Sequence, residues 1–387
     1  MSDIRPIPYG RQFISEEDIQ AVVETLKSDY LTQGPKIGEF EEKFAEYVGA
    51  KYAVAVSNGT AALHLSALSM DIKEGQKVIT TPITFAASAN CIVYAGGEVD
   101  FADIDPETYL IDIEKVEEKL ANEPKGSYCG IIPVDFAGRA VNLEKLKNLA
   151  DEYGLWIIED AAHSPGGYFV SDEGEQKLCG SCEFTECAIF SFHPVKHIAA
   201  GEGGMITTND LAVYNKLIML RSHGITKSPE LLNENHGGWY YEMQELGFNY
   251  RLTDIQAALG VSQLKRANQG LENRRAIAAK YQKELQDIPQ IIRQSGVVGG
   301  HAYHLYVIEV EDRLGLYNYL RENNVFTQIH YIPIHLMPFY KKKNWNKGDF
   351  PEAERYYDHC ISLPMYHTLT QDQQNRVIDL IKDYYNK

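Results

Sequence analysis

The chain has 387 residues, of which 44% are hydrophobic and 24% charged, and its 54 acidic residues against 37 basic ones give a net charge of −17. This length can bury the cores of two domains, and the acidic excess argues against nucleic acid or an anionic membrane as a partner. No apolar run reaches the ~20 residues of a membrane span, and the first residues lack the apolar segment of a signal peptide. We therefore expect a cytoplasmic protein.

The first half of the chain alternates predicted helices and strands. Helices are expected at 15–28, 37–48, 61–70, 86–94 and 143–153, and strands at 52–56, 77–80, 98–102, 130–134 and 155–159. This alternation is typical of a mostly parallel sheet with helices on both faces. In such α/β sheets, ligands bind beyond the carboxyl ends of the strands.

The second half is less regular. Residues 223–250 are too long and irregular for a simple connection, and long loops of this kind are often functional. Around them, helices are expected at 210–220, 252–264, 271–285, 314–323 and 371–385, and strands at 304–310 and 325–330. We therefore expect a large α/β domain at 1–260, which begins with an extended segment at 1–12, and a small C-terminal α+β domain at 261–387.

One lysine lies in a tight connection between two predicted strands. Lys196 follows the apolar run Ala188–Phe192 and precedes a glycine-rich break, Gly201–Gly204, and the strand-like piece Met205–Thr208. A lysine held among apolar groups loses hydration, so its pKa falls and its amine can attack a carbonyl. An ordinary surface lysine in a loop is the alternative.

Other candidate groups also stand where predicted strands end. Asp160 could hold a proton on a ring nitrogen, and the turn Ser57–Thr60 opens a helix whose N–H groups suit a phosphate. Ser191 could donate a hydroxyl to the same phosphate, and Phe85 could stack on a planar ring. Each has an ordinary alternative as a helix cap or core residue. Together with the lysine they form the set that pyridoxal 5′-phosphate (PLP) requires.

Several motifs resemble those of the DegT-type sugar aminotransferases, and the likeness runs along nearly the whole chain. The matching segments are Asn58–Leu63, Thr81–Phe85, Glu159–His163, Phe190–Lys196, Gly201–Gly204 and Gly247–Arg251. Closer markers resemble the branch of this family that serves pseudaminic-acid biosynthesis. These are Pro8–Gln12, Leu31–Gly34, Phe192–Lys196, Arg221–Gly224, Gln328–Pro333 and Ile361–Pro364.

The resemblance implies a fold type I aminotransferase that works as a homodimer with shared active sites. It assigns Lys196 as the catalytic residue that forms an imine with PLP, and Asp160 as the partner of the ring nitrogen. Lysine at this position argues for transamination, because a related branch with histidine there performs dehydration. The resemblance also gives cofactor contacts to Gly59, Thr60, Phe85, His163, Ser191 and, from the partner subunit, Asn249.

The same resemblance implies the two substrates. The amino group of L-glutamate would move to C4 of a UDP-linked 4-keto-6-deoxy-N-acetylhexosamine, releasing 2-oxoglutarate. The residues that it assigns to substrate binding are Tyr9, Asp29, Tyr30, Leu31, Thr32, Gly59, Ser191, Asn249, Gln328, Ile329, His330 and Tyr331. The group that binds the glutamate carboxylates and the stereochemistry of the sugar stay open.

Three alternatives remain at this stage. The acceptor could be another nucleotide 4-ketosugar, of the perosamine or legionaminic type. The chain could instead be a PLP-binding regulatory protein, although it shows no added nucleic-acid-binding module and its charge opposes one. Finally, Cys179, Cys182 and Cys187 could suggest zinc, but no paired fourth ligand is evident nearby, and we expect reduced cysteines in a loop and no metal site.

Overall fold

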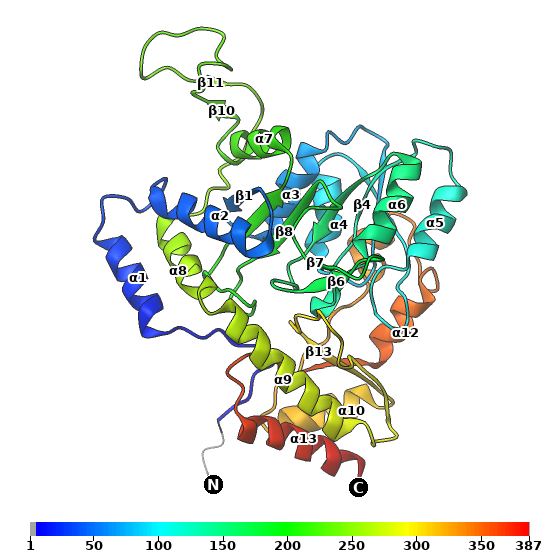
Figure 1. The fold of residues 1–387 in the computed structure, drawn as a ribbon. Helices are drawn as coiled ribbons and strands as arrows, with labels where there is room; N and C mark the ends of the chain where they lie inside the picture. The colour runs from blue at the N-terminus through cyan, green and yellow to red at the C-terminus, as the bar shows by residue number, and fades with distance from the viewer. Residues whose placement is uncertain (1–4, 387) are drawn as a thin grey trace.

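The computed structural model describes residues 5–386 and places a large α/β part beside a smaller α+β part (Figure 1). The large part is built on a seven-stranded sheet of order β1-β9-β8-β5-β4-β2-β3. Its strands are β1 (Tyr52–Val56), β2 (Lys77–Thr80), β3 (Glu98–Phe101), β4 (Tyr128–Ile132), β5 (Trp156–Asp160), β8 (Cys187–Ser191) and β9 (Gly204–Thr208). β9 runs antiparallel to both of its neighbours, β1 and β8, and the other adjacent strands pair in parallel, which confirms the predicted mostly parallel sheet.

Helices cover both faces of this sheet because successive residues of each strand point to opposite sides. Val78 and Ile132 pack in the core on one face, whereas Ile79 and Ile131 pack on the other. The first face is covered by α3 (Gly59–Ser69), α4 (Ala86–Tyr94) and α7 (Leu211–Arg221). The second carries α2 (Pro35–Val48), α5 (Ile113–Ala121), α6 (Leu143–Tyr153) and α8 (Asp254–Leu264), and α1 (Glu16–Leu26) lies along α8 (Figure 1).

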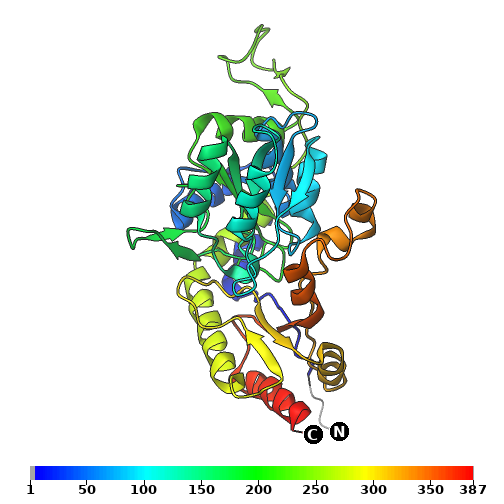
Figure 2. The same cartoon turned by 90° about the vertical axis from the view of Figure 1, so that its right-hand side faces the viewer.

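The smaller part is a three-stranded antiparallel sheet with its own core. Its strands, in the order β12-β13-β14, are β12 (Ile291–Gln294), β13 (Tyr306–Val310) and β14 (Cys360–Leu363), and its helices are α9 (Ala267–Leu285), α10 (Arg313–Glu322) and α13 (Gln371–Tyr385). Figure 2 shows α9 and α13 on one side of these strands. The core of this part begins on α9 at Ile277, whereas Val261 on α8 packs with the large part. The division at 260/261 remains our proposal.

Between β13 and β14 the chain returns to the large part. The short helices α11 (Pro338–Lys341) and α12 (Pro351–His359) follow a 3-10 turn at Ile334–Leu336. Tyr340, Phe350 and Tyr356 join the core that contains Phe101 of β3. The sequence did not predict α5, α12, β12 or β14.

One predicted strand is wrong. Residues 325–330 form single bridges with two different parts of the chain, Val325 with Ile7 and Gln328 with Ser362. Because the neighbour changes within the segment, no continuous ladder can extend along it. Two other boundaries move slightly, since β4 begins two residues earlier than expected and β5 includes Asp160.

Residues 223–250 project from the large part as a long excursion that carries the two-residue strands β10 (Ile225–Thr226) and β11 (Glu242–Met243) (Figure 1). Its apolar side chains are unusually open, with Trp239 75% and Leu246 80% exposed. A short antiparallel pair, β6 (Tyr168–Val170) and β7 (Gln176–Leu178), follows β5. Within residues 5–386, none of the helices combines the length and the apolar character needed to cross a membrane.

Candidate active site

The register of the central sheet brings several strand ends to one edge. Gly204, the first residue of β9, pairs with Val56 at the end of β1 and with Ser191 at the end of β8. A Cβ at Gly204 would stand 2.5 Å from the carbonyl oxygen of Asn58. A Cβ at Gly59 would likewise stand 3.0 Å from Cβ of Ser191. The two glycines therefore allow these turns to come into close contact.

The start of α3 forms one wall of this edge. Asn58 caps the helix, because its side chain accepts a 2.8 Å hydrogen bond from the backbone N–H of Ala61. Gly59 and Thr60 are the first helical residues, so their N–H groups have no acceptor within the helix. With the hydroxyl of Ser191 beside them, these donors and the positive end of the helix dipole suit a phosphate group.

Lys196 lies in the connection between β8 and β9. This connection is tight, because the backbone N–H of Phe192 donates to Gly203 and that of Ala200 donates back to Phe192. Burial lowers the pKa of Lys196 to about 7, against the opposing influence of Asp160, which raises it. The amine is therefore substantially neutral near pH 7, which is the form that acts as a nucleophile or base.

Asp160 ends β5 at the same edge, and its side chain is buried. Its Oδ2 accepts a 2.7 Å hydrogen bond from Oγ of Ser88, and its Oδ1 accepts a 3.2 Å bond from the backbone N–H of Ala162. Ser88 in turn shares a 2.8 Å hydrogen bond with Thr84. Burial raises the pKa of Asp160, while Ser88 and the charge of Lys196 lower it. The carboxylate is thus fixed in orientation and electrostatically coupled to the lysine.

His163 connects this edge to the segment Gln328–Tyr331. Its Nδ1 accepts a 3.3 Å hydrogen bond from the backbone N–H of Ala137, so the ring proton belongs on Nε2. Nε2 can then donate to the hydroxyl oxygen of Tyr331, 3.3 Å away. Burial lowers the pKa of His163 well below its usual value, so the ring is neutral. Phe85, which is 62% exposed, lies with its ring 6.3 Å from that of Tyr331.

The segment Gln328–Tyr331 is held from its other side by Ser362 of β14. The backbones of Gln328 and Ser362 exchange two hydrogen bonds, of 3.2 and 2.8 Å. Nδ1 of His330 lies 2.9 Å from Oγ of Ser362, and the ring of His330 lies 5.4 Å from that of Tyr9. Burial and the charge of Lys196 lower the pKa of His330 to about 3. Tyr9, His330 and Tyr331, which the resemblance grouped, therefore lie together near the lysine.

Two predicted parts of the site, residues 29–32 and Asn249, are not seen in contact with the lysine. Residues 29–32 are exposed, and the carboxylate of Asp254 fixes the turn beside them by accepting from the backbone N–H groups of Gly34 and Lys36 at 2.8 and 2.9 Å. Asn249 is exposed and lies next to Tyr250, whose carbonyl accepts from Ser57 at the end of β1. Within the described part of one chain, neither residues 29–32 nor Asn249 contacts Lys196. Their assignments to the site therefore stay predictions.

The family follows from comparison with known proteins. The model of the DegT/DnrJ/EryC1/StrS aminotransferase family matches residues 12–382. The chain belongs to this family. It is therefore an aminotransferase, and the predicted aminotransferase fold is confirmed by solved members of the same kind.

Relatives of known name align along almost the whole chain. The spore coat polysaccharide biosynthesis protein SpsC of Bacillus subtilis is 38% identical over 97% of this chain and 96% of its own. A UDP-4-amino-4,6-dideoxy-N-acetyl-beta-L-altrosamine transaminase of Campylobacter jejuni is 34% identical over 97% of this chain and 96% of its own.

Solved sugar aminotransferases share the fold. The structure of Helicobacter pylori PseC, an aminotransferase of pseudaminic-acid biosynthesis, matches with a TM-score of 0.89 and 28% identity over 99% of this chain and 100% of that one. The PLP-form of the putative sugar aminotransferase Spr1654 from Streptococcus pneumoniae matches with a TM-score of 0.87 and 25% identity over 98% and 99%. This family member is thus a sugar aminotransferase.

Three groups behind this family's site were missed from the sequence: Ser88, His304 and the pair of acids beside Cys179. The ring of His304 lies 4.3 Å from that of His163. The acids Asp135 and Glu159 have oxygen atoms within 4.8 Å of each other and of the sulfur of Cys179. Burial and the charge of Asp135 raise the pKa of Glu159 well above its usual value.

This buried group also bears on the zinc alternative. Among the described residues, the ligand atoms of Cys179, Asp135 and Glu159 lie within 4.8 Å of one another. Cys182 and Cys187 are not part of this group. Cys182 instead donates to the carbonyl of Thr207, and Cys187 packs in the core on the opposite face of the sheet. The three cysteines therefore do not form the site that their spacing suggested.

Proposed function

We propose that this protein uses PLP to move the amino group of L-glutamate to C4 of a UDP-linked 4-keto-6-deoxy-N-acetylhexosamine, as a homodimer in the cytoplasm. The observation that carries the proposal is the meeting of two groups at one sheet edge. They are the amine of Lys196, whose pKa desolvation lowers to about 7, and the fixed carboxylate of Asp160. The names of the Campylobacter and Helicobacter proteins support the choice of acceptor.

The residues present fit PLP. A Cβ at position 59 would fill the space beside Ser191. Because glycine has no Cβ, a phosphate can approach the backbone there. Asp160 offers a buried, oriented carboxylate for a ring N–H, and Phe85 offers an exposed aromatic face nearby. When bound, PLP supplies a carbonyl for the lysine and a ring that accepts electrons from the substrate.

The chain's own groups would then act as follows. Nζ of Lys196 would hold the cofactor and, once the amino acid displaces it, would move a proton from the substrate's α-carbon to the carbon that carried the cofactor's carbonyl. Asp160 keeps a proton on the ring nitrogen, and Ser88 holds the carboxylate in the required orientation. His163, neutral and hydrogen-bonded on both ring nitrogens, holds the hydroxyl of Tyr331 at the rim of the site.

The acceptor pocket would be formed by two chains. Tyr9 and the segment Gln328–Tyr331 would line it from one chain, with the segment Asp29–Thr32 at its edge. Asn249 would come from the partner subunit. The exposed apolar side chains of 223–250, which include Trp239, support a partner surface, because a projecting apolar excursion is unfavourable in water.

A second acceptor is favoured by one observation. SpsC, whose name gives no particular sugar, is more similar in sequence than the Campylobacter transaminase, at 38% against 34% identity. A different nucleotide 4-ketosugar, such as one of the perosamine or legionaminic type, is therefore the alternative to test.

The test uses purified protein reconstituted with PLP. Adding L-glutamate alone should convert the absorbance of the bound cofactor to that of pyridoxamine phosphate, which a regulatory PLP-binding protein without turnover would not do. A panel of nucleotide 4-ketosugars then identifies the acceptor by the amine found in the product. Lys196→Arg should abolish both activities, and full activity of this variant would rule out the proposed function.

A further inference from the structure

The segment Gln328–Tyr331 has one anchor that lies outside the site itself. Tyr356 of α12 donates a 2.7 Å hydrogen bond from its hydroxyl to the backbone carbonyl of His330. We propose that Tyr356 is a positioning residue for the sugar nucleotide, which fixes the peptide between His330 and Tyr331 without touching substrate. This inference rests on the role proposed above for that segment.

The surroundings of Tyr356 leave its hydroxyl little freedom. The side chain is fully buried, and its ring lies 4.6 Å from that of Tyr109 and 5.8 Å, edge to face, from that of Phe136. These contacts come from the large part of the molecule, whereas β14, which binds the same segment through Ser362, belongs to the smaller part. The carbonyl of His330 is therefore held by an element wedged between the two parts.

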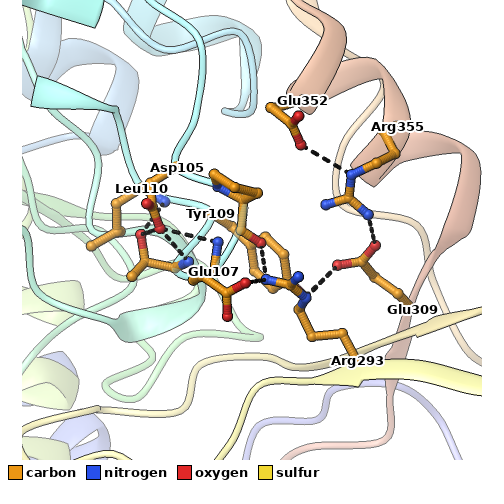
Figure 3. A network of polar contacts seen from close by, with 10 residues as sticks. Asp105, Glu107, Tyr109, Leu110, Arg293, Glu309, Glu352 and Arg355 are labelled. Atoms are coloured by element: carbon orange, nitrogen blue, oxygen red, sulfur yellow. Dashed lines mark hydrogen bonds and ion pairs between the residues drawn. The ribbon is translucent and has the colours of Figure 1, made fainter. Parts of the chain in front are cut away.

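Two neighbours of Tyr356, Tyr109 and Arg355, belong to a charged network (Figure 3). Tyr109 donates a 2.7 Å hydrogen bond to Glu309 of β13, whose carboxylate is completely buried. The other oxygen of Glu309 accepts a 2.5 Å bond from Arg355, the residue before Tyr356, and Arg293 of β12 lies 3.6 Å from the carboxylate. Buried charges need such partners, so breaking the network is costly.

Arg293 extends the network to the large part. It forms a 2.8 Å ion pair with Glu107 and donates to the carbonyl of Pro106, in the loop that also carries Tyr109 (Figure 3). The loop after β3, the strands β12 and β13, and α12 are thus joined around one carboxylate. The hydroxyl of Tyr356 then fixes the carbonyl of His330 by a hydrogen bond, and the ring of His330 lies beside that of Tyr9.

The expected consequence is selective. The hydrogen bonds that fix Asp160 come from Ser88 and Ala162 and do not involve Tyr356, so the exchange with glutamate should not depend on the hydroxyl of Tyr356. The acceptor pocket should depend on it, because His330 and Tyr331 lose one of the hydrogen bonds that fix their peptide. A role confined to stability would instead affect both substrates equally.

The test compares Tyr356→Phe with Tyr128→Phe in the full-length dimeric protein loaded with PLP. Tyr128 is also a buried tyrosine, and its hydroxyl donates to Asp100 at the opposite end of β4 from the site. For Tyr356→Phe, we expect the KM for the sugar nucleotide to rise about three- to tenfold, the range for losing one buried hydrogen bond. The KM for glutamate should stay within about twofold, and Tyr128→Phe should change neither KM.

A second variant tests the network. Tyr109→Phe keeps the ring against Tyr356 but removes its bond to Glu309, so it should raise the same KM by a smaller factor. Equal changes for both substrates, or no change in a folded Tyr356→Phe protein, would overturn the role of Tyr356. If the wild-type protein aminates no sugar nucleotide, the proposed function fails instead, and this inference falls with it.

Discussion

Ser88 on α4 donates a 2.7 Å hydrogen bond to Oδ2 of Asp160 at the end of β5, across 72 residues of sequence. This bond occupies one carboxylate oxygen and leaves the other with a single, longer bond from the backbone of Ala162. It also stabilises the ionised form of a carboxylate whose burial raises its pKa. The carboxylate is therefore oriented, and its ionised form favoured, by a residue that is not itself expected to touch the cofactor.

Replacing Ser88 should change the pH dependence of the reaction. Because the Ser88 bond lowers the pKa of Asp160, Ser88→Ala should raise that pKa further, so Asp160 takes up its proton at a higher pH as the solution is acidified. The acid limb of kcat/KM for glutamate should move upward by about one pH unit, as a hydrogen bond to a charged group implies. Ser69→Ala, which removes a buried hydroxyl elsewhere, is the control. An unchanged acid limb would remove this role of Ser88.

The attachment of PLP to Lys196 should follow the neutral amine. Burial lowers the pKa of Lys196 to about 7, so attachment to the apoprotein should rise with pH around a midpoint near 7 and level off above it. Because Asp160 raises the pKa of Lys196, Asp160→Asn should move the midpoint to lower pH. The attached fraction is measured by mass spectrometry after borohydride reduction. A midpoint near the ordinary lysine value of ~10.4 would contradict the buried, neutral amine.

The cradle at Gly59 should not tolerate a side chain. The Cβ of Gly59→Ala would meet Cβ of Ser191 at 3.0 Å, and the wall of the phosphate site would have to move. We expect PLP affinity to fall about tenfold, in line with the cost of overpacking a tight contact. The control is Gly38→Ala on the exposed side of α2, where the new Cβ meets open space. This substitution should stabilise the helix by about 0.5–1 kcal/mol and leave PLP binding unchanged. Equal affinities in the two variants would show that the cradle is elsewhere.

Sharing of the active site between subunits can be tested by mixing two inactive proteins. Lys196→Arg and Asn249→Ala chains are co-expressed, and the mixed dimers are assayed. If Asn249 acts on the partner's site, one site of each mixed dimer is intact, and about a quarter of wild-type activity should appear in a random mixture. If Asn249 acts within its own chain, the mixed dimers stay inactive.

The parts of the site that the sequence predicted are those carried by a strand end. Asp160 and Ser191 end the short strands β5 and β8, and Gly59 and Lys196 follow β1 and β8 closely. Parallel strands bring such positions to one edge. Ser88 gave no such signal, because its role depends on a hydrogen bond between distant segments. The apolar residues near Lys196 in the sequence indicated that its amine would lose hydration. The pKa of about 7, however, depends on three-dimensional packing, which the sequence does not describe.

The small part of the molecule was harder to predict for a related reason. The segment 325–330 has the composition of a strand, but only Val325 and Gln328 form bridges, with Ile7 and Ser362. Both sides of β13 are already paired, with β12 and with β14. The anchor of this segment, Tyr356, lies on a helix that the sequence did not predict. Long-range partners such as these are set by tertiary packing and not by local propensity.

The most direct measurement of the central claim is the structure of the product. The PLP-loaded protein is incubated with L-glutamate and UDP-4-keto-6-deoxy-N-acetylhexosamine, and the sugar nucleotide is examined by mass spectrometry and NMR. We predict one new amino group, located at C4, formed in equal amount with 2-oxoglutarate and absent with Lys196→Arg. A recovered ketosugar without an amine, from protein whose bound cofactor does react with glutamate, would contradict the proposed acceptor.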